Sequence, residues 1–261
     1  MPDIAAKVLS IPEDDATISF KELENLIKVD PGLTTKILKV ANSAMYARQK
    51  EITTLQTAFT MLGFKTIKSL VFLISASSML KDGADKGFYK RFWKHSILSA
   101  FTAQNIAERA GFARKADESF LAGLLHDIGE TALFNADPDL YLSLSSEEEE
   151  TDAFGTDHKE VGEMVLNEWD FPSILVDTAR EHGSLNITSP HKTIILIVSA
   201  ADLIAKYYSD ELETDLDDTM FDAFLMRINL TEKDKDFYLN DFHDKLIEEP
   251  MFKECSSLFG L

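Results

Sequence analysis

Apolar residues recur every three or four positions along most of this chain, with polar residues between them. This spacing is typical of amphipathic helices, because 3.6 residues make one helical turn. The first apolar stripe contains Leu23, Leu26 and Ile27. Ser19 and Glu22 precede it with the spacing of a capping box, in which each side chain accepts a hydrogen bond from a backbone N–H of the first turn. The pattern therefore predicts a helix capped by Ser19.

Helix-breaking residues separate this stripe from the next ones. Asp30 suits the position before a helix and Pro31 suits the first turn, so a second helix is predicted to begin there. Further apolar stripes cover residues 33–41, 54–62 and 67–74. No segment alternates apolar and polar residues between hairpin turns. The sequence therefore predicts an all-α protein.

One apolar segment, residues 193–201 (TIILIVSAA), fits two structures. Its β-branched residues could form a buried strand. Its continuation through residues 202–205 (DLIA) instead favours a long buried helix, which we expect.

Two polar segments interrupt the helical pattern. Residues 81–87 (KDGADKG) divide the chain into two predicted parts, residues 1–85 and 86–261. Residues 143–152 (SLSSEEEETD) contain four adjacent glutamates, which repel one another. We expect this second segment to be a solvated surface loop or a frayed helix end.

The composition is that of an ordinary globular protein. The 261 residues are 45% hydrophobic and 27% charged, which suffices for a sizeable core. The apolar uncharged run of residues 69–80 has 12 residues, and no uncharged run in the sequence exceeds 13, whereas a membrane helix needs about 20. The first ten residues lack the basic and apolar segments of a signal peptide. Because the single Cys255 cannot form an internal disulfide, we expect a cytoplasmic location.

The charge is acidic and unevenly distributed. The net charge is −19, from 26 basic and 45 acidic side chains. Residues 1–90 carry a net +2, residues 91–202 a net −12 and residues 203–261 a net −9. Nucleic acids and anionic membranes bind through lysine and arginine. The charge therefore argues against both as partners.

Histidines and aspartates are the candidates for chemistry. His126 and Asp127 adjoin each other after the apolar residues 121–125. Imidazole and carboxylate groups are ligands of Zn, Fe and Mn ions. A carboxylate such as that of Asp127 can also bridge two ions.

The other candidate residues have alternative interpretations. His95 fits a core position, His158 fits an exposed position in a polar helix, and His182 fits a helix C-terminus, where a cation is favourable. Asp202 differs, because it interrupts the apolar run of residues 194–204. A buried carboxylate without a partner costs several kcal/mol, so Asp202 requires a cation, a metal ion or hydrogen-bond donors.

The order His95, His126-Asp127, Asp202 resembles the H…HD…D ligand pattern of the HD superfamily of metal-dependent phosphohydrolases. Three further segments resemble the HDOD family, the HD-related output domain. These segments are residues 26–44 (LIKVDPGLTTKILKVANSA), 54–63 and 120–129 (FLAGLLHDIG). The resemblance covers residues 2–205, which is most of the chain.

The resemblance implies both a fold and a metal site. The implied fold is an N-terminal helical bundle, residues 1–85, packed on an HD-like helical bundle with a C-terminal helical extension, residues 86–261, together forming one HDOD module. The implied site holds one or two transition-metal ions (Fe, Mn or Zn), with no organic cofactor and no residue assigned as catalytic. Its implied ligands are His95, His126, Asp127, His158, His182 and Asp202.

The resemblance also implies a function in bacterial signal transduction. HDOD modules are output or scaffold units, and they are related to the HD-GYP phosphodiesterases that cleave cyclic di-GMP. The expected partner is therefore a signalling protein, with no nucleic acid and no membrane. Assembly into a homo-oligomer stays an open alternative.

Three departures from the HD-GYP pattern weigh against catalysis. Gly183 replaces the second member of a His-His pair, and Glu130 replaces the lysine that usually follows His-Asp-x-Gly. Residues 183–186 (GSLN) stand where the HD-GYP run would be. A non-catalytic signalling module is the favoured interpretation, and a metal-dependent phosphohydrolase is the alternative.

Overall fold

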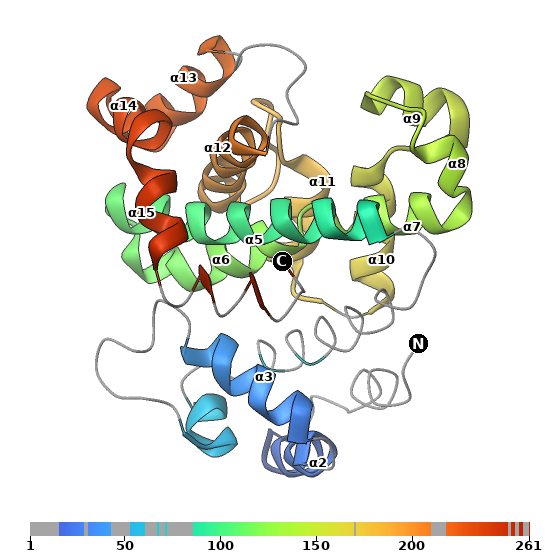
Figure 1. Ribbon diagram of the computed structural model, residues 1–261, viewed down its shortest axis with the longest axis vertical. Helices are drawn as coiled ribbons and strands as arrows, with labels where there is room; N and C mark the ends of the chain where they lie inside the picture. Colours follow the sequence, from blue (N-terminus) through green and yellow to red (C-terminus); the bar gives the residue numbers. More distant parts are fainter. Residues whose placement is uncertain are drawn as a thin grey trace. The chain divides into compact units, whose positions relative to one another are not determined.

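The computed structural model is helical. It describes residues 16–28, 31–42, 53–60, 67, 71, 86–169, 171–209, 218–249, 252–253, 256–257 and 261. No strand occurs among these residues, which confirms the predicted all-α fold (Figure 1). None of the helices within these ranges is long and apolar enough to cross a membrane.

The chain divides into two compact units. Unit 1 comprises Met1–Lys90 and Glu248–Leu261, and unit 2 comprises Arg91–Ile247. The assignment of residues 1–85 and 86–261 to two bundles, one packed on the other, stays a prediction.

In unit 1, the helices α2 (Ala16–Lys28) and α3 (Pro31–Asn42) follow the apolar stripes. Leu23 is fully buried, and α3 begins at its proline, as predicted. Ser19 lies inside α2, so the predicted capping box was wrong. The apolar stripe was thus a better guide to this helix than the local capping signal.

Other parts of the N-terminal prediction are only partly covered by the described residues. The predicted helix over residues 54–62 is observed at positions 55–60. The predicted helix over residues 67–74 is observed at its two described positions, 67 and 71. Cys255 lies outside the described residues.

The remaining described α-helices lie wholly or mostly in unit 2, and among them are those that position the candidate site residues. These helices are α5 (Lys86–Arg109), α6 (Ala116–Leu125), α7 (Ile128–Ala136), α8 (Pro138–Tyr141), α9 (Glu147–Phe154), α10 (His158–Glu168), α11 (Ser173–Glu181), α12 (Lys192–Tyr208), α13 (Asp218–Arg227), α14 (Glu232–Asn240) and α15 (Phe242–Glu248). The ambiguous segment 193–201 lies within α12, as we expected. Most of α12 is buried on every side, because its sequence is apolar all round.

The acidic segment 143–152 is more ordered than predicted. Residues 147–152 form the first turns of α9, so the prediction of a loop or frayed end was wrong for them. The Ser146 hydroxyl accepts a hydrogen bond from the backbone N–H of Glu149, 3.2 Å away. Negative charge near a helix N-terminus is also favourable, which offsets the repulsion among the glutamates.

Two helices next to the candidate site approach each other at a glycine. The backbone of Gly129 in α7 lies against α10, and a Cβ atom added there would be 1.9 Å from the carbonyl oxygen of His158 and 2.6 Å from the backbone nitrogen of Gly162. Real Cβ atoms do not approach backbone so closely. Only glycine therefore fits this position without moving one helix.

We expect Gly129→Ala to destabilise the protein by about 1–3 kcal/mol or more, because the added methyl group overpacks a contact with backbone. Thermal denaturation followed by far-UV circular dichroism measures the effect. Gly87→Ala in α5 is the matched control, since nothing lies within 4 Å of its added Cβ atom. Equal melting temperatures for the two variants would contradict the expectation.

Candidate metal centre

The His126-Asp127 pair lies at the junction of two helices. The helix α6 ends at Leu125 and α7 begins at Ile128, so the pair occupies the turn between them. Leu124 and Leu125 are buried and fix the end of α6 in the core. The side chains of His126 and Asp127 are themselves buried, with 0% and 3% of their residue surface exposed.

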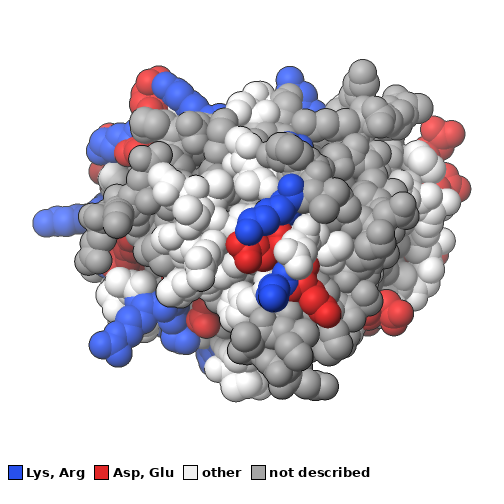
Figure 2. All heavy atoms as spheres, turned by 90° about the horizontal axis from the view of Figure 1, so that it is seen from below, with Lys and Arg blue, Asp and Glu red and all other residues white. Residues whose placement is uncertain are grey.

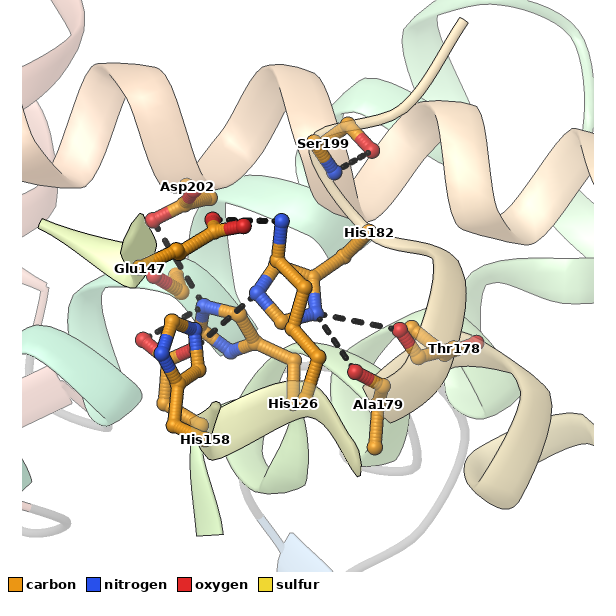
Figure 3. A network of polar contacts seen from close by, with 12 residues as sticks. His126, Glu147, His158, Thr178, Ala179, His182, Ser199 and Asp202 are labelled. Atoms are coloured by element: carbon orange, nitrogen blue, oxygen red, sulfur yellow. Dashed lines mark hydrogen bonds and ion pairs between the residues drawn. The ribbon is translucent and has the colours of Figure 1, made fainter. Parts of the chain in front are cut away.

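Four other helices bring the remaining candidates to this turn. His95 lies in α5, His158 is the first residue of α10, His182 directly follows α11, and Asp202 lies in α12. All four are buried. The alternative interpretation of His158 as an exposed residue is therefore wrong. The six predicted ligands converge in two groups that share Asp127, and Figure 3 shows His126, His158, His182 and Asp202 side by side. Their role as metal ligands stays a prediction.

The first group of donor atoms consists of His95 Nε2, His126 Nε2, Asp127 Oδ2 and Asp202 Oδ1. The two imidazole nitrogens are 3.3 Å apart. The four nitrogen–oxygen separations are 3.0, 3.1, 3.3 and 3.5 Å. Atoms about 2.1 Å from one ion lie about 3.0 Å apart in octahedral and about 3.4 Å apart in tetrahedral coordination. The group therefore has the dimensions of a shell around one transition-metal ion.

Asp127 also belongs to a second group of three residues. Its other oxygen, Oδ1, lies 3.1 Å from His182 Nε2 and 3.7 Å from His158 Nε2. One carboxylate thus faces both groups, each through a different oxygen. This is the arrangement expected of a carboxylate that bridges two cations.

Hydrogen bonds at Nδ1 fix the orientation of three imidazole rings. His126 Nδ1 donates to the Gly123 carbonyl (2.8 Å), and His182 Nδ1 donates to the Ala179 carbonyl (3.0 Å). His158 Nδ1 donates to the carboxylate of Glu150 (2.8 Å). A carbonyl or carboxylate oxygen only accepts, so each Nδ1 carries a hydrogen, and Nε2 of the neutral ring presents its lone pair to the cluster. Metal-ligating histidines show the same outer contacts.

The electrostatics of the cluster favours a bound cation. Burial lowers the pKa of His182 to about 4, with the charges of His126 and Lys159 acting in the same direction. A neutral His182 places no proton between its Nε2 and the Asp127 oxygen at 3.1 Å. Two lone pairs then face each other in a buried site, which a bound cation would stabilise. The donor set therefore fits a metal ion.

In the metal-free protein, protonated histidines compensate the negative charges of Asp127 and Asp202. Burial lowers the pKa of His126, but the negative charges of Asp127 and Asp202 outweigh it and raise that pKa to about 9. The Glu150 carboxylate likewise outweighs burial and raises the pKa of His158 to about 9. The charge of His126 holds the pKa of the Asp127 carboxyl well below its usual range, against the effect of burial.

Sequence reasoning missed two charged residues beside the cluster. Lys206 Nζ lies 2.9 Å from Asp202 Oδ2, and its charge keeps the pKa of the Asp202 carboxyl low despite burial. The i,i+4 spacing of this pair in α12 could have indicated the contact. Glu150 is buried and accepts hydrogen bonds from both the backbone N–H and Nδ1 of His158. Nothing in a run of four glutamates distinguishes it from its neighbours.

The Glu130 carboxyl group also interacts electrostatically with residues of the cluster. Burial and the negative charge of Asp127 raise the pKa of Glu130 to about 7. The position that carries a lysine in the HD-GYP pattern thus carries a carboxyl group that is only partly ionised at neutral pH.

A family model of the HDOD domain matches residues 1–185. The chain belongs to the HDOD family. This HDOD protein is 24% identical over 223 residues to an uncharacterized protein of Treponema pallidum. The aligned region is 81% of this chain and 43% of that relative. The chain therefore spans less than half the length of the curated relative that it matches.

Solved structures share the fold of this HDOD protein. A phosphohydrolase candidate from Shewanella amazonensis SB2B superposes with a TM-score of 0.67 and 22% identity, covering 99% of this chain and 94% of that one. A candidate signal transduction protein from Marinobacter aquaeolei VT8 gives a TM-score of 0.66 and 18% identity, covering 100% of this chain and 59% of that one. At these identities the likeness concerns the fold alone.

Proposed function

We propose that this HDOD protein is a signal-transduction output or scaffold module whose buried site binds a transition-metal ion and has little or no hydrolytic activity. The metal part of the proposal is supported by the close approach of two imidazole nitrogens and two carboxylate oxygens. Imidazole ligands favour Fe, Zn or Mn-type ions over Ca and Mg. An ion held there would organise the ends of several helices.

The observation that carries the non-catalytic part is Glu130. The negative charge of Asp127 helps to raise the pKa of the Glu130 carboxyl to about 7, so this position offers a phosphate group no positive charge at neutral pH. In HD-GYP enzymes, which the chain resembles, this position carries a lysine. Losing the attraction of a lysine for a phosphate group changes the interaction by about 4 kcal/mol at ~4 Å and an effective dielectric constant of ~20. Each 1.4 kcal/mol is about tenfold in rate or affinity.

A metal-dependent phosphohydrolase is the second candidate function. The observation in its favour is Asp127, whose two oxygens face two separate groups of donors. Two metal ions bound there would supply Lewis acidity toward a phosphate ester. Asp127 and the buried histidines would hold both ions.

The expected partner is a signalling protein rather than a nucleic acid or a membrane. Residues 91–202, which contain the site, carry 20 acidic against 8 basic side chains. At the centre of the face in Figure 2, basic side chains lie beside acidic ones, and the described residues form no continuous basic surface in that view. Such a surface suits a protein partner or a second copy of the chain. The proposal places the module in the cytoplasm, which the single cysteine of the sequence supports.

Hydrolysis assays separate the two candidate functions. We expect metal-loaded protein to turn over cyclic di-GMP and bis-p-nitrophenyl phosphate at well below ~1 s⁻¹, the low end of typical enzymes. We expect Glu130→Lys to improve binding of both compounds, with Glu118→Lys on the exposed surface of α6 as the matched charge control. Turnover above ~1 s⁻¹ by the unmodified protein, lost in Asp127→Asn, would instead establish the phosphohydrolase.

A further inference from the structure

A lysine lies beside the second group of donors and has no part in it. Lys159 follows His158 at the start of α10, and its side chain is 13% exposed. Its Nζ forms an ion pair with Oε1 of Glu147, the first residue of α9, and the dashed line from Glu147 marks this pair in Figure 3. The positive charge of Lys159 also helps to lower the pKa of His182.

The absence of a side chain at Gly183 provides the room for this ammonium group. A Cβ atom added to Gly183 would lie 3.4 Å from Lys159 Nζ. Lys159 thus occupies the space into which a side chain at position 183 would extend. Gly183 also has a φ of +75°, which L side chains rarely adopt. A histidine here, as in the His-His pair of the HD-GYP pattern, would compete with the lysine for this space.

We propose that Lys159 is the oxyanion-binding group of this site, that it receives the phosphate group of a ligand, and that the Glu147 carboxylate occupies its place when no ligand is bound. This inference rests on the proposed function, because it makes ligand binding without hydrolysis the input of the module. A lysine ammonium is a common partner of phosphate groups. The position of Lys159 also supplies a positive charge to a site in which Glu130 replaces the lysine of the HD-GYP pattern.

The geometry makes Glu147 suitable as a displaceable counter-ion. Its side chain is 50% exposed, whereas that of Lys159 is mostly buried. A half-exposed carboxylate can leave for solvent at low cost, because exposed ion pairs are weak. A phosphate group carries more charge than one carboxylate, so it would displace Glu147 from the lysine. The acidic α9 helix would then lose one of its contacts with α10.

Titration calorimetry on the metal-loaded protein tests this proposal, with inorganic phosphate and guanosine monophosphate as separate ligands. We expect Lys159→Met to weaken binding of the preferred ligand at least 10-fold and Glu147→Gln to tighten it about threefold or more. Gly183→His should weaken binding as Lys159→Met does, because the imidazole displaces the ammonium group. The matched controls are Lys192→Met and Glu148→Gln, both exposed in the structure, and they should bind like the unmodified protein.

The two ligands distinguish free phosphate from an organic phosphate, since only the preferred one should show the full dependence on Lys159. Equal affinity of the unmodified protein and Lys159→Met for both ligands would overturn the proposal, as would an unchanged affinity in Glu147→Gln. Metal content measured on the same samples separates this failure from that of the proposed function. Absence of metal from the unmodified protein contradicts the proposed function, whereas bound metal with no effect of Lys159 contradicts only this inference.

Discussion

Asp127→Asn is expected to remove metal from the protein almost completely. Asp127 faces both groups of donors, so no other single substitution among the six residues affects both. Loss of a residue that only orients a ligand typically costs 10–100-fold in metal affinity, and loss of the shared ligand should exceed 100-fold. Asparagine keeps the shape of the side chain but lacks the negative charge that a metal cation requires. Elemental analysis of purified protein, before and after dialysis against metal, measures the result.

Asp152→Asn is the matched control for this substitution. Asp152 lies exposed in α9, so the same chemical change there should leave the metal content intact. We expect both variants to retain their helices, which far-UV circular dichroism measures. Full metal content in folded Asp127→Asn would contradict the site described above.

The metal-free protein should become less stable as the pH rises from about 7 to 9. The pKa values of His126 and His158 are raised to about 9 in the folded protein, from about 6.5 in the unfolded chain. A raised pKa stabilises the folded state fully below pH 6.5, and this contribution is lost as the pH rises through 9. Each shift corresponds to about 3 kcal/mol, of which about 2 kcal/mol is lost between pH 7 and 9. Together these losses predict a fall of about 8–16 °C in melting temperature.

His182 acts in the opposite sense and in a different pH range. Its pKa is lowered to about 4, so its contribution is present above pH 6.5 and is lost as the pH falls toward 4. It therefore does not offset the loss between pH 7 and 9. Metal reverses the trend there, because ligands bind in their deprotonated form and metal stabilises the fold more at higher pH.

Thermal melts in chelator at half-unit steps from pH 6 to 9 test this expectation. His158→Gln should remove about half of the pH dependence. His191→Gln, outside the cluster, should leave it unchanged. A constant melting temperature of the metal-free protein over this range would show that protonated histidines do not compensate the carboxylate charges of the cluster.

The helical fold could be predicted because apolar spacing directly reflects which faces are buried. This held even for α12, where Asp202 and the following residues decided between strand and helix. The capping box at Ser19 failed because a capping signal involves few residues, whereas the stripe that includes Leu23 is supported by the whole core.

The candidate site could be predicted only in part from the residues themselves. The adjacent His126 and Asp127 suggested a metal site, but convergence with His95 and Asp202 came from the resemblance to a family. Glu150 and Lys159 could not be identified, because their neighbours in sequence have the same charge or polarity. Which of them points inward depends on the helix phase, which in α9 is fixed by the cap at Ser146.

The positions of the candidate metal ligands in the sequence also affect how the chain unfolds. His95 and Asp202 are 107 positions apart in the sequence, yet their side chains are 3.1 Å from each other. An ion bound to both would close a loop of about one hundred residues, as a disulfide between the same positions would. In the chain-entropy model, such a cross-link restricts the unfolded chain by about 4–5 kcal/mol. A chelator would therefore act on this protein as a reducing agent acts on a disulfide-bonded one, and metal supply would control its lifetime against proteolysis.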